Sequence, residues 1–203
     1  MGIASGIKTC AMAAVIVTGS AFAALAATFN GSFTIGGNAF SSPGLVVNAS
    51  PTSGPLNLNL TVGQSVTFDL FDIWTNDPLI NGSDTTPQSI FVDFDIGRSG
   101  GVGALNGTTQ GNTAFIFQYG SVNWQAPLML AFGNGGLMQI SLSNEIFNFG
   151  VFGLSAGQAN GATVQATATL IAAPVPLPAA GLGLLAGLGG LALVRRRRMR
   201  DAA

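Results

Sequence analysis

The sequence predicts an all-β domain, a single β-sandwich of jelly-roll or immunoglobulin-like topology, flanked by two apolar termini. Three observations lead to this prediction. Apolar and polar residues alternate with a period of two many times between positions 28 and 173, clusters of Gly, Asn, Ser and Pro separate these runs, and no convincing helix-period stretch occurs between them. Roughly eight to ten strands are expected at this spacing.

The alternating runs identify the predicted strands, because alternation buries one face of a strand and exposes the other. In one run, Asp93 and Asp95 fall on the exposed face. Between Leu70 and Phe71 the apolar phase shifts by one residue, which predicts a β-bulge there. The clearest runs are 56–61, 66–70, 90–96 and 163–170.

The clusters between the runs predict turns. Gly and Asn reach positive φ without a large steric cost, and Pro fixes φ near the value that many turns require. The predicted turn segments are 36–38, 41–44, 50–55, 81–87, 97–111 and 133–136.

Charge is segregated along the chain. Between positions 28 and 173 the only basic residue is Arg98, against seven acidic residues, which gives 1 − 7 = −6. A domain of this charge repels nucleic acid and anionic membrane surfaces, so we expect no nucleic-acid partner.

The sequence lacks the residues that most catalytic and metal sites need. It contains no histidine, and its one cysteine, Cys10, lies in the N-terminal apolar segment. Histidine-assisted nucleophiles, thiol catalysis and thiolate zinc sites are therefore excluded from the domain, and we predict a noncatalytic protein without a required cofactor.

A carboxylate-rich stretch between Asp69 and Asp95 offers one candidate metal site. Hard oxygen ligands suit Ca²⁺, although the spacing matches no standard calcium loop and a solvated face is the competing interpretation. The candidate ligands are Asp72, Asn76, Asp77, Asn81 and Asp84.

Two further hypotheses involve carbohydrate. A carboxylate-based glycoside hydrolase would use a pair of acids from the same stretch. A carbohydrate-binding module, with or without calcium, would stack sugars on aromatic side chains, for which Trp74, Trp124 and Tyr119 are the candidates. Packing of these three side chains in the core is the alternative.

Residues 1–26 have the pattern of a signal peptide. Lys8 precedes an apolar stretch, and Ala24 and Ala26 form the A-x-A pattern that signal peptidase recognises, with residues 21–23 as the alternative cut. An uncleaved membrane helix is the competing interpretation. We therefore expect the chain to be exported.

The C-terminal part predicts a membrane-spanning helix with a fixed orientation. Residues 179–194 carry no charge and would rise about 24 Å as a helix, enough for a thin bilayer. The basic cluster that follows must stay cytoplasmic, so the domain 27–173 faces outward from the inner membrane. The cluster consists of Arg195, Arg196, Arg197, Arg198 and Arg200.

A proline-rich strip precedes this helix. It contains Val175, Pro176, Leu177, Pro178 and Ala179, and its prolines hold the backbone extended. Strip, apolar helix and arginine cluster together, over residues 174–200, resemble the PEP-CTERM sorting signal of Gram-negative bacteria in its VPLPA variant. The glutamate that gives the class its name is absent from the 176–178 segment.

The resemblance implies processing by an exosortase, a membrane transpeptidase-like enzyme, and an association with exopolysaccharide and biofilm. A plain one-pass anchor without processing is the alternative. We therefore expect a noncatalytic cell-surface or extracellular-matrix protein that meets signal peptidase, an exosortase-like enzyme and, in one hypothesis, extracellular polysaccharide. It would begin as a single-pass inner-membrane precursor with its N-terminus outside.

Overall fold

A computed structural model describes residues 26–97 and 101–174 of the 203-residue chain. Within these residues the protein is all-β, with single turns of 3-10 helix at Asn38–Phe40 and Gln158–Asn160. The strands are β1 (Ala26–Gly36), β2 (Val47–Ser50), β3 (Ser53–Thr61), β4 (Ser65–Thr75), β5 (Gln88–Asp95), β6 (Val102–Ala114), β7 (Phe117–Trp124), β8 (Leu128–Phe132), β9 (Gly136–Leu142), β10 (Glu145–Val151) and β11 (Ala162–Ala172).

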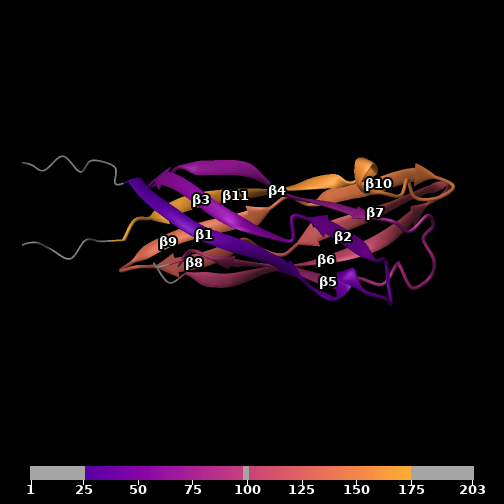
Figure 1. Cartoon of the computed structure of the whole chain (residues 1–203), viewed down its shortest axis with the longest axis horizontal. Coiled ribbons are helices and arrows are strands. Elements are labelled where there is room, and N and C mark those ends of the chain that lie inside the picture. Colours follow the sequence, from indigo (N-terminus) through magenta and orange to yellow (C-terminus); the bar gives the residue numbers. More distant parts are fainter. Residues whose placement is uncertain (1–25, 98–100, 175–203) are drawn as a thin grey trace, which may run out of the picture.

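The strands form two curled antiparallel sheets (Figure 1). One has six strands in the order β10-β7-β6-β5-β1-β3, and the other has five in the order β2-β4-β11-β9-β8. Each sheet has an apolar inner face, because the alternating residues of every long strand point to opposite sides. The two inner faces meet in one core.

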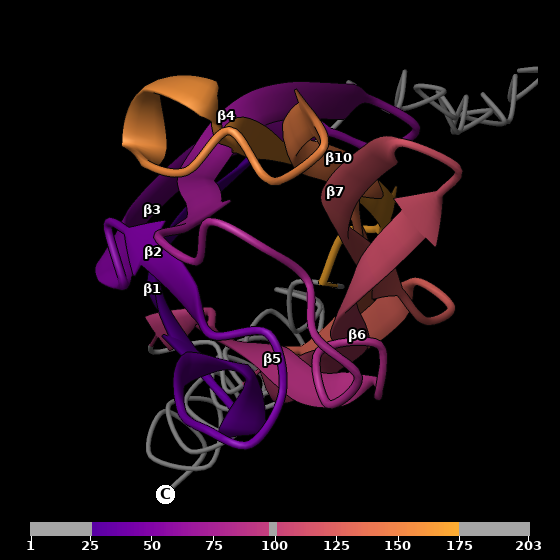
Figure 2. The ribbon, with the colours of Figure 1, turned by 90° about the vertical axis from the view of Figure 1, so that its right-hand side faces the viewer.

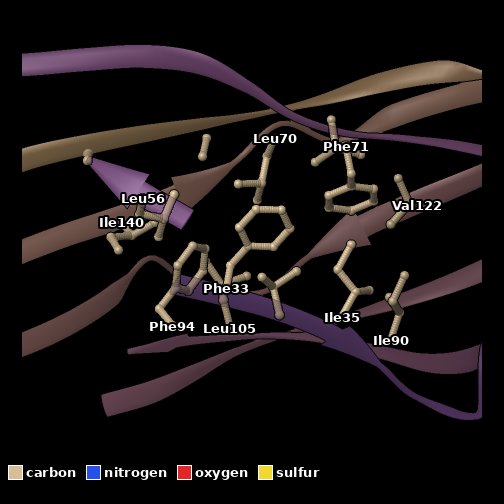
Figure 3. Packing of buried hydrophobic residues seen from close by; sticks show 14 of the residues in the cluster. Phe33, Ile35, Leu56, Leu70, Phe71, Ile90, Phe94, Leu105, Val122 and Ile140 are labelled. Carbon is tan, nitrogen blue, oxygen red and sulfur yellow. The ribbon is translucent and has the colours of Figure 1, made fainter. Parts of the chain in front are cut away.

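Large apolar side chains from both sheets interdigitate in this core (Figure 3). Phe33 and Phe94 come from the six-stranded sheet, and Leu70, Phe71 and Ile140 come from the five-stranded sheet. Each of these five side chains is at most 5% exposed. Burial of such side chains stabilises the fold by about 1.5 to 3 kcal/mol each.

The predicted alternation is confirmed in these strands. Ile90, Val92 and Phe94 are buried in β5, while Asp93 and Asp95 are exposed. The same holds in β11, where the inward positions 164, 166, 168 and 170 are all fully buried.

The predicted bulge at Leu70 is also confirmed. On β11, Val164 pairs with Phe71, but the next residue, Gln165, pairs with Asp69, so Leu70 has no partner in the register. Both Leu70 and Phe71 are consequently buried, although they are adjacent in sequence. The bulge therefore places both halves of β4 with their apolar side chains in the core.

Three expectations were wrong. The described residues hold eleven strands rather than eight to ten. The predicted turn 50–55 is shorter, because β3 begins at Ser53, and the predicted turn 97–111 ends early, because β6 begins at Val102. The glycines within β6 are strand residues that make room for neighbouring side chains. Gly103, Gly107 and Gly111 face inward, where a β-carbon would collide with side chains of Leu130, Trp124 and Ile80, respectively.

The two ends of the elongated molecule differ in content. β1 starts and β11 finishes at one end, which we call the proximal end (Figure 1). The hairpin between β6 and β7 and the last residues of β10 lie at the opposite, distal end, which faces the viewer in Figure 2. The expected signal peptide, except for Ala26, and the sorting motif 175–179 fall outside the described residues.

Candidate functional site

Two of the predicted calcium ligands, Asn81 and Asp84, lie together in one turn of the loop between β4 and β5. The Asp84 carboxylate is 3% exposed and accepts a hydrogen bond from the Asn81 backbone N–H at 2.8 Å. The Asp84 carbonyl accepts a second one, from Gly111 N–H at 2.7 Å, which ties the loop to β6. Asp84 thus has a role in holding its own loop.

The other predicted ligands have different surroundings. Asp72 accepts a hydrogen bond from the Thr163 hydroxyl at 2.7 Å, between β4 and β11. Asp77 accepts one from the Val46 backbone at 3.3 Å, and Asn76 is exposed at the end of β4. In residues 26–97 and 101–174, no three acidic, histidine or cysteine side chains gather as a metal-binding group.

A different group of residues forms a groove of about 420 Å³ on the outer face of β6, β7 and β10. The alternation of the strands places them there, since residues 119, 121 and 123 of β7 point away from the core that Val122 enters. The lining side chains are mostly amides and hydroxyls. They are Gln110, Asn112, Tyr119, Ser121, Asn123, Asn144, Glu145 and Ile146.

Hydrogen bonds fix the floor of this groove. The Gln110 amide donates to Asn112 Oδ1 at 3.0 Å, and the Asn112 amide donates to Ser121 Oγ at 2.8 Å. The Asn123 side chain forms no hydrogen bond within the described part of the chain. Glu145 lines the groove at the edge of the sheet, where it pairs with the core-facing Val122. The groove therefore combines oriented polar groups with one side chain, Asn123, that has no partner in the described chain and can bond a ligand.

A stack of three aromatic rings lies beside the polar floor, and its Tyr119 ring lines the groove. Tyr119 stacks on Phe149 with ring centroids 6.3 Å apart, and Phe149 stacks on Phe117 at 5.3 Å. Phe149 is 53% exposed, so a face of this stack is open to solvent. Aromatic faces beside hydrogen-bonding amides are the combination that binds the apolar and hydroxyl-bearing surfaces of a sugar.

A bulge in β10 turns Phe149 toward Tyr119. The register with β7 shifts between Phe147 and Gly150, and Asn148 in the bulge adopts φ 51°. The Asn148 side chain is fully buried and reaches three backbone groups. It accepts a hydrogen bond from Thr75 N–H and donates to the carbonyls of Ser155 and Gly157.

Of the three aromatic residues that the sequence suggested for sugar stacking, only Tyr119 lines this groove. Trp124 packs edge-to-face on the buried Phe71, with centroids 6.4 Å apart, and Trp74 is half-buried on β4. The amides of the groove were missed by the sequence reasoning. The polar positions 108, 110 and 112 and their respective partners 123, 121 and 119 follow period-two alternation, which was the available signal.

The remaining predicted sites lie elsewhere in the chain. The sorting motif 175–179, the arginine cluster 195–200 and Ala24 fall outside the described residues, whereas Ala26 is the first residue of β1. Among residues 26–97 and 101–174, no helix has the length and apolar character needed to cross a bilayer. No protein-family model, curated protein or solved structure matches this chain.

Proposed function

We propose that this chain is an exported, noncatalytic protein of the cell surface or extracellular matrix. An exosortase-like membrane enzyme would process it at residues 175–179, after signal peptidase has removed the N-terminal segment. The observation that carries the proposal is the order of proline-rich strip, apolar helix and arginine cluster in residues 174–200.

The shape of the described domain supports this topology. Because β1 starts and β11 finishes at the proximal end, the distal end would point away from the membrane while the precursor is anchored (Figure 1). β1 already pairs at Ala26, which lies opposite Thr61. Signal cleavage after Ala23, the alternative cut, would keep this first strand complete.

We further assign the two sheets to a single β-sandwich. The chain crosses repeatedly between them, since β1, β3, β5, β6, β7 and β10 belong to one sheet and the other strands to the second. Crossings of this kind occur in both jelly-roll and immunoglobulin-like sandwiches.

A second candidate function, carbohydrate binding, is favoured by the groove on β6, β7 and β10. Its amides can bond sugar hydroxyls, and the stack of Tyr119 and Phe149 can cover an apolar sugar face. Glu145 is the one carboxylate among the lining residues, whereas glycoside hydrolysis commonly uses two. We therefore expect a neutral oligosaccharide to be bound and left intact.

Intact-mass analysis of the mature protein tests the sorting proposal. We expect the form isolated from the cell surface or medium to lack both the signal peptide and the residues after 179. A variant with Pro176 and Pro178 replaced by alanine should keep the tail, because the extended strip presented to the enzyme would be lost. Retention of residues 180–203 on the wild-type surface form would contradict processing.

A glycan array followed by titration calorimetry tests the carbohydrate proposal. We expect neutral oligosaccharides to bind with and without a chelator. Asn123→Ala should weaken binding about tenfold, because one hydrogen bond of roughly 1.4 kcal/mol to the ligand is lost. The Asn123 side chain forms no hydrogen bond within the described chain, so its replacement should leave stability unchanged.

Asn57→Ala provides the matched control for this experiment. Asn57 is also an exposed asparagine on a strand of the same sheet, but it lies on β3, away from the groove. Its replacement should leave the affinity as it is. Equal losses from both variants, or an array on which nothing binds, would count against the groove as a sugar site.

A further inference from the structure

The distal end exposes a cluster of apolar side chains, which we call the distal patch: Phe115, Ile116, Val151 and Phe152. Phe115 is 100% exposed and Phe152 is 75% exposed. The Phe152 N–H donates to the Ile116 carbonyl at 2.6 Å, so the tip of the β6–β7 hairpin and the end of β10 form one unit. Figure 2 looks onto these two segments.

Both phenylalanines occupy strained backbone positions. Phe115 has φ 63° and Phe152 has φ 60°, a region that bulky L-residues rarely adopt. Glycine or asparagine would fit these turns better, and a polar side chain would suit the solvent better. Folding therefore accounts for neither phenylalanine, and residues held in such conformations concentrate at functional sites.

The same chain contains an apolar groove of a size that can accommodate a phenylalanine side chain of the distal patch. A groove of about 350 Å³ lies between β3 and β4, which we call the β3–β4 groove. It opens where the sheets separate, because β2 pairs with residues 72–75 of β4 and leaves residues 65–70 beside β3. Most of its lining is apolar: Phe33, Pro55, Leu56, Leu58, Val66, Phe68 and Leu70, with Asn57 and Asp69 at its sides.

The β3–β4 groove lies toward the proximal half of the molecule. Thr61, at the end of β3, pairs with Ala26 at the start of β1, and β3 is seen on that side of Figure 1. The convex patch and the apolar groove are thus different surfaces toward opposite ends of one molecule. A contact between them joins two different surfaces, so it either repeats from copy to copy or forms twice in a closed antiparallel pair. Only the repeating arrangement gives multimers larger than a dimer when both surfaces carry a cross-linking site.

We propose that the distal patch of one copy docks in the β3–β4 groove of a second copy, so that the chains associate head to tail. Chemistry favours this occupant, because two apolar surfaces meet and the described residues carry seven acidic but no basic side chains that could attract an anionic lipid surface. The contact is independent of the sugar groove.

The contact is small and should be weak in dilute solution. Two phenylalanine side chains bury roughly 150 to 250 Å² each, which keeps the interface below the roughly 1,200 Å² of stable complexes. Because each copy carries net negative charge, added salt should strengthen the association by screening repulsion. A contact driven by charge attraction would respond in the opposite direction.

Site-directed cross-linking tests the proposal on the full chain in phosphatidylcholine nanodiscs, with Cys10→Ser to remove the native thiol. Phe152→Cys and Leu58→Cys are made as separate variants and mixed with a short bismaleimide. We expect dimers from the mixture, none from either variant alone, and a ladder of multimers when both changes are in one chain. Phe152→Cys mixed with Thr67→Cys, on the exposed face of β4, should give at least tenfold fewer dimers.

Polar replacements separate assembly from folding. Phe115→Asn with Phe152→Asn should leave the melting temperature unchanged or higher, because asparagine tolerates positive φ, and should lower cross-linking at least tenfold. Ile171→Asn, which alters an exposed apolar residue of β11, should leave cross-linking unchanged. Dimers of Phe152→Cys alone would overturn the head-to-tail arrangement. Undiminished cross-linking of the double asparagine variant would do the same. Binding of the distal patch to the lipid of the nanodiscs would also overturn it.

Discussion

Replacement of Asn148 by alanine is expected to lower the free energy of unfolding by about 3 to 5 kcal/mol. The change leaves a buried N–H of Thr75 and the carbonyls of Ser155 and Gly157 without their side-chain partner, and each such loss costs about 1 to 3 kcal/mol. Alanine at φ 51° adds strain. Urea denaturation followed by tryptophan fluorescence measures the effect.

Two further variants identify the cause. Asn148→Gly tolerates the positive φ but still loses the three hydrogen bonds, so it should recover only the strain contribution of about 1 kcal/mol. Asn106→Ala, an exposed asparagine of β6, should change stability by less than about 0.5 kcal/mol. An Asn148→Ala variant as stable as Asn106→Ala would show that the buried amide does not hold these segments together.

Asn148→Ala should also alter the groove on β6, β7 and β10. Asn148 holds the bulge that turns Phe149 outward, so loss of its side chain would release the Phe149 ring on which Tyr119 stacks. Asn148, which does not face the groove, would in this way influence sugar binding by positioning the aromatic rings beside it. The distal patch depends on the same segment, because Val151 and Phe152 continue directly from β10.

Local periodicity was enough to predict the strands that bury one face. It also predicted the bulge at Leu70, because the phase shift in the apolar residues is visible within a few positions of the chain. Both features depend on nearest neighbours along one strand. The apolar residues at alternating positions then face the core, because that arrangement removes them from water.

Other features depend on residues far apart in sequence and could not be predicted in this way. The glycines of β6 look like turn signals, but they are strand residues whose missing side chains make room for Leu130, Trp124 and Ile80. The groove joins three strands whose pairing the periodicity does not reveal. The carboxylate-rich stretch between Asp69 and Asp95 shows the converse. Its residues are close in sequence, but Asp72 and Asp77 accept hydrogen bonds from different donors.

Replacement of Gly120 by alanine is expected to destabilise the domain by about 2 to 3 kcal/mol. Gly120 is buried in β7 opposite Phe147 of β10, and a β-carbon there would lie 2.5 Å from Cζ of the Phe147 ring and closer still to Cε2. The ring is 1% exposed and has little space to move, so the added methyl overpacks the core. Chemical denaturation measures the loss.

Gly82→Ala and a double-mutant cycle make this prediction specific. A β-carbon at Gly82 meets no described atom within 4 Å, so alanine there should leave stability within about 0.5 kcal/mol of the wild type. If the Phe147 ring causes the loss at Gly120, adding Phe147→Leu should give a coupling energy above about 1 kcal/mol, since the two positions are in contact. Additive losses would show instead that the strain arises elsewhere in β7. The positions of Tyr119 and Ser121, which flank Gly120 and line the groove, would then be set by the backbone of β7 rather than by its packing against β10.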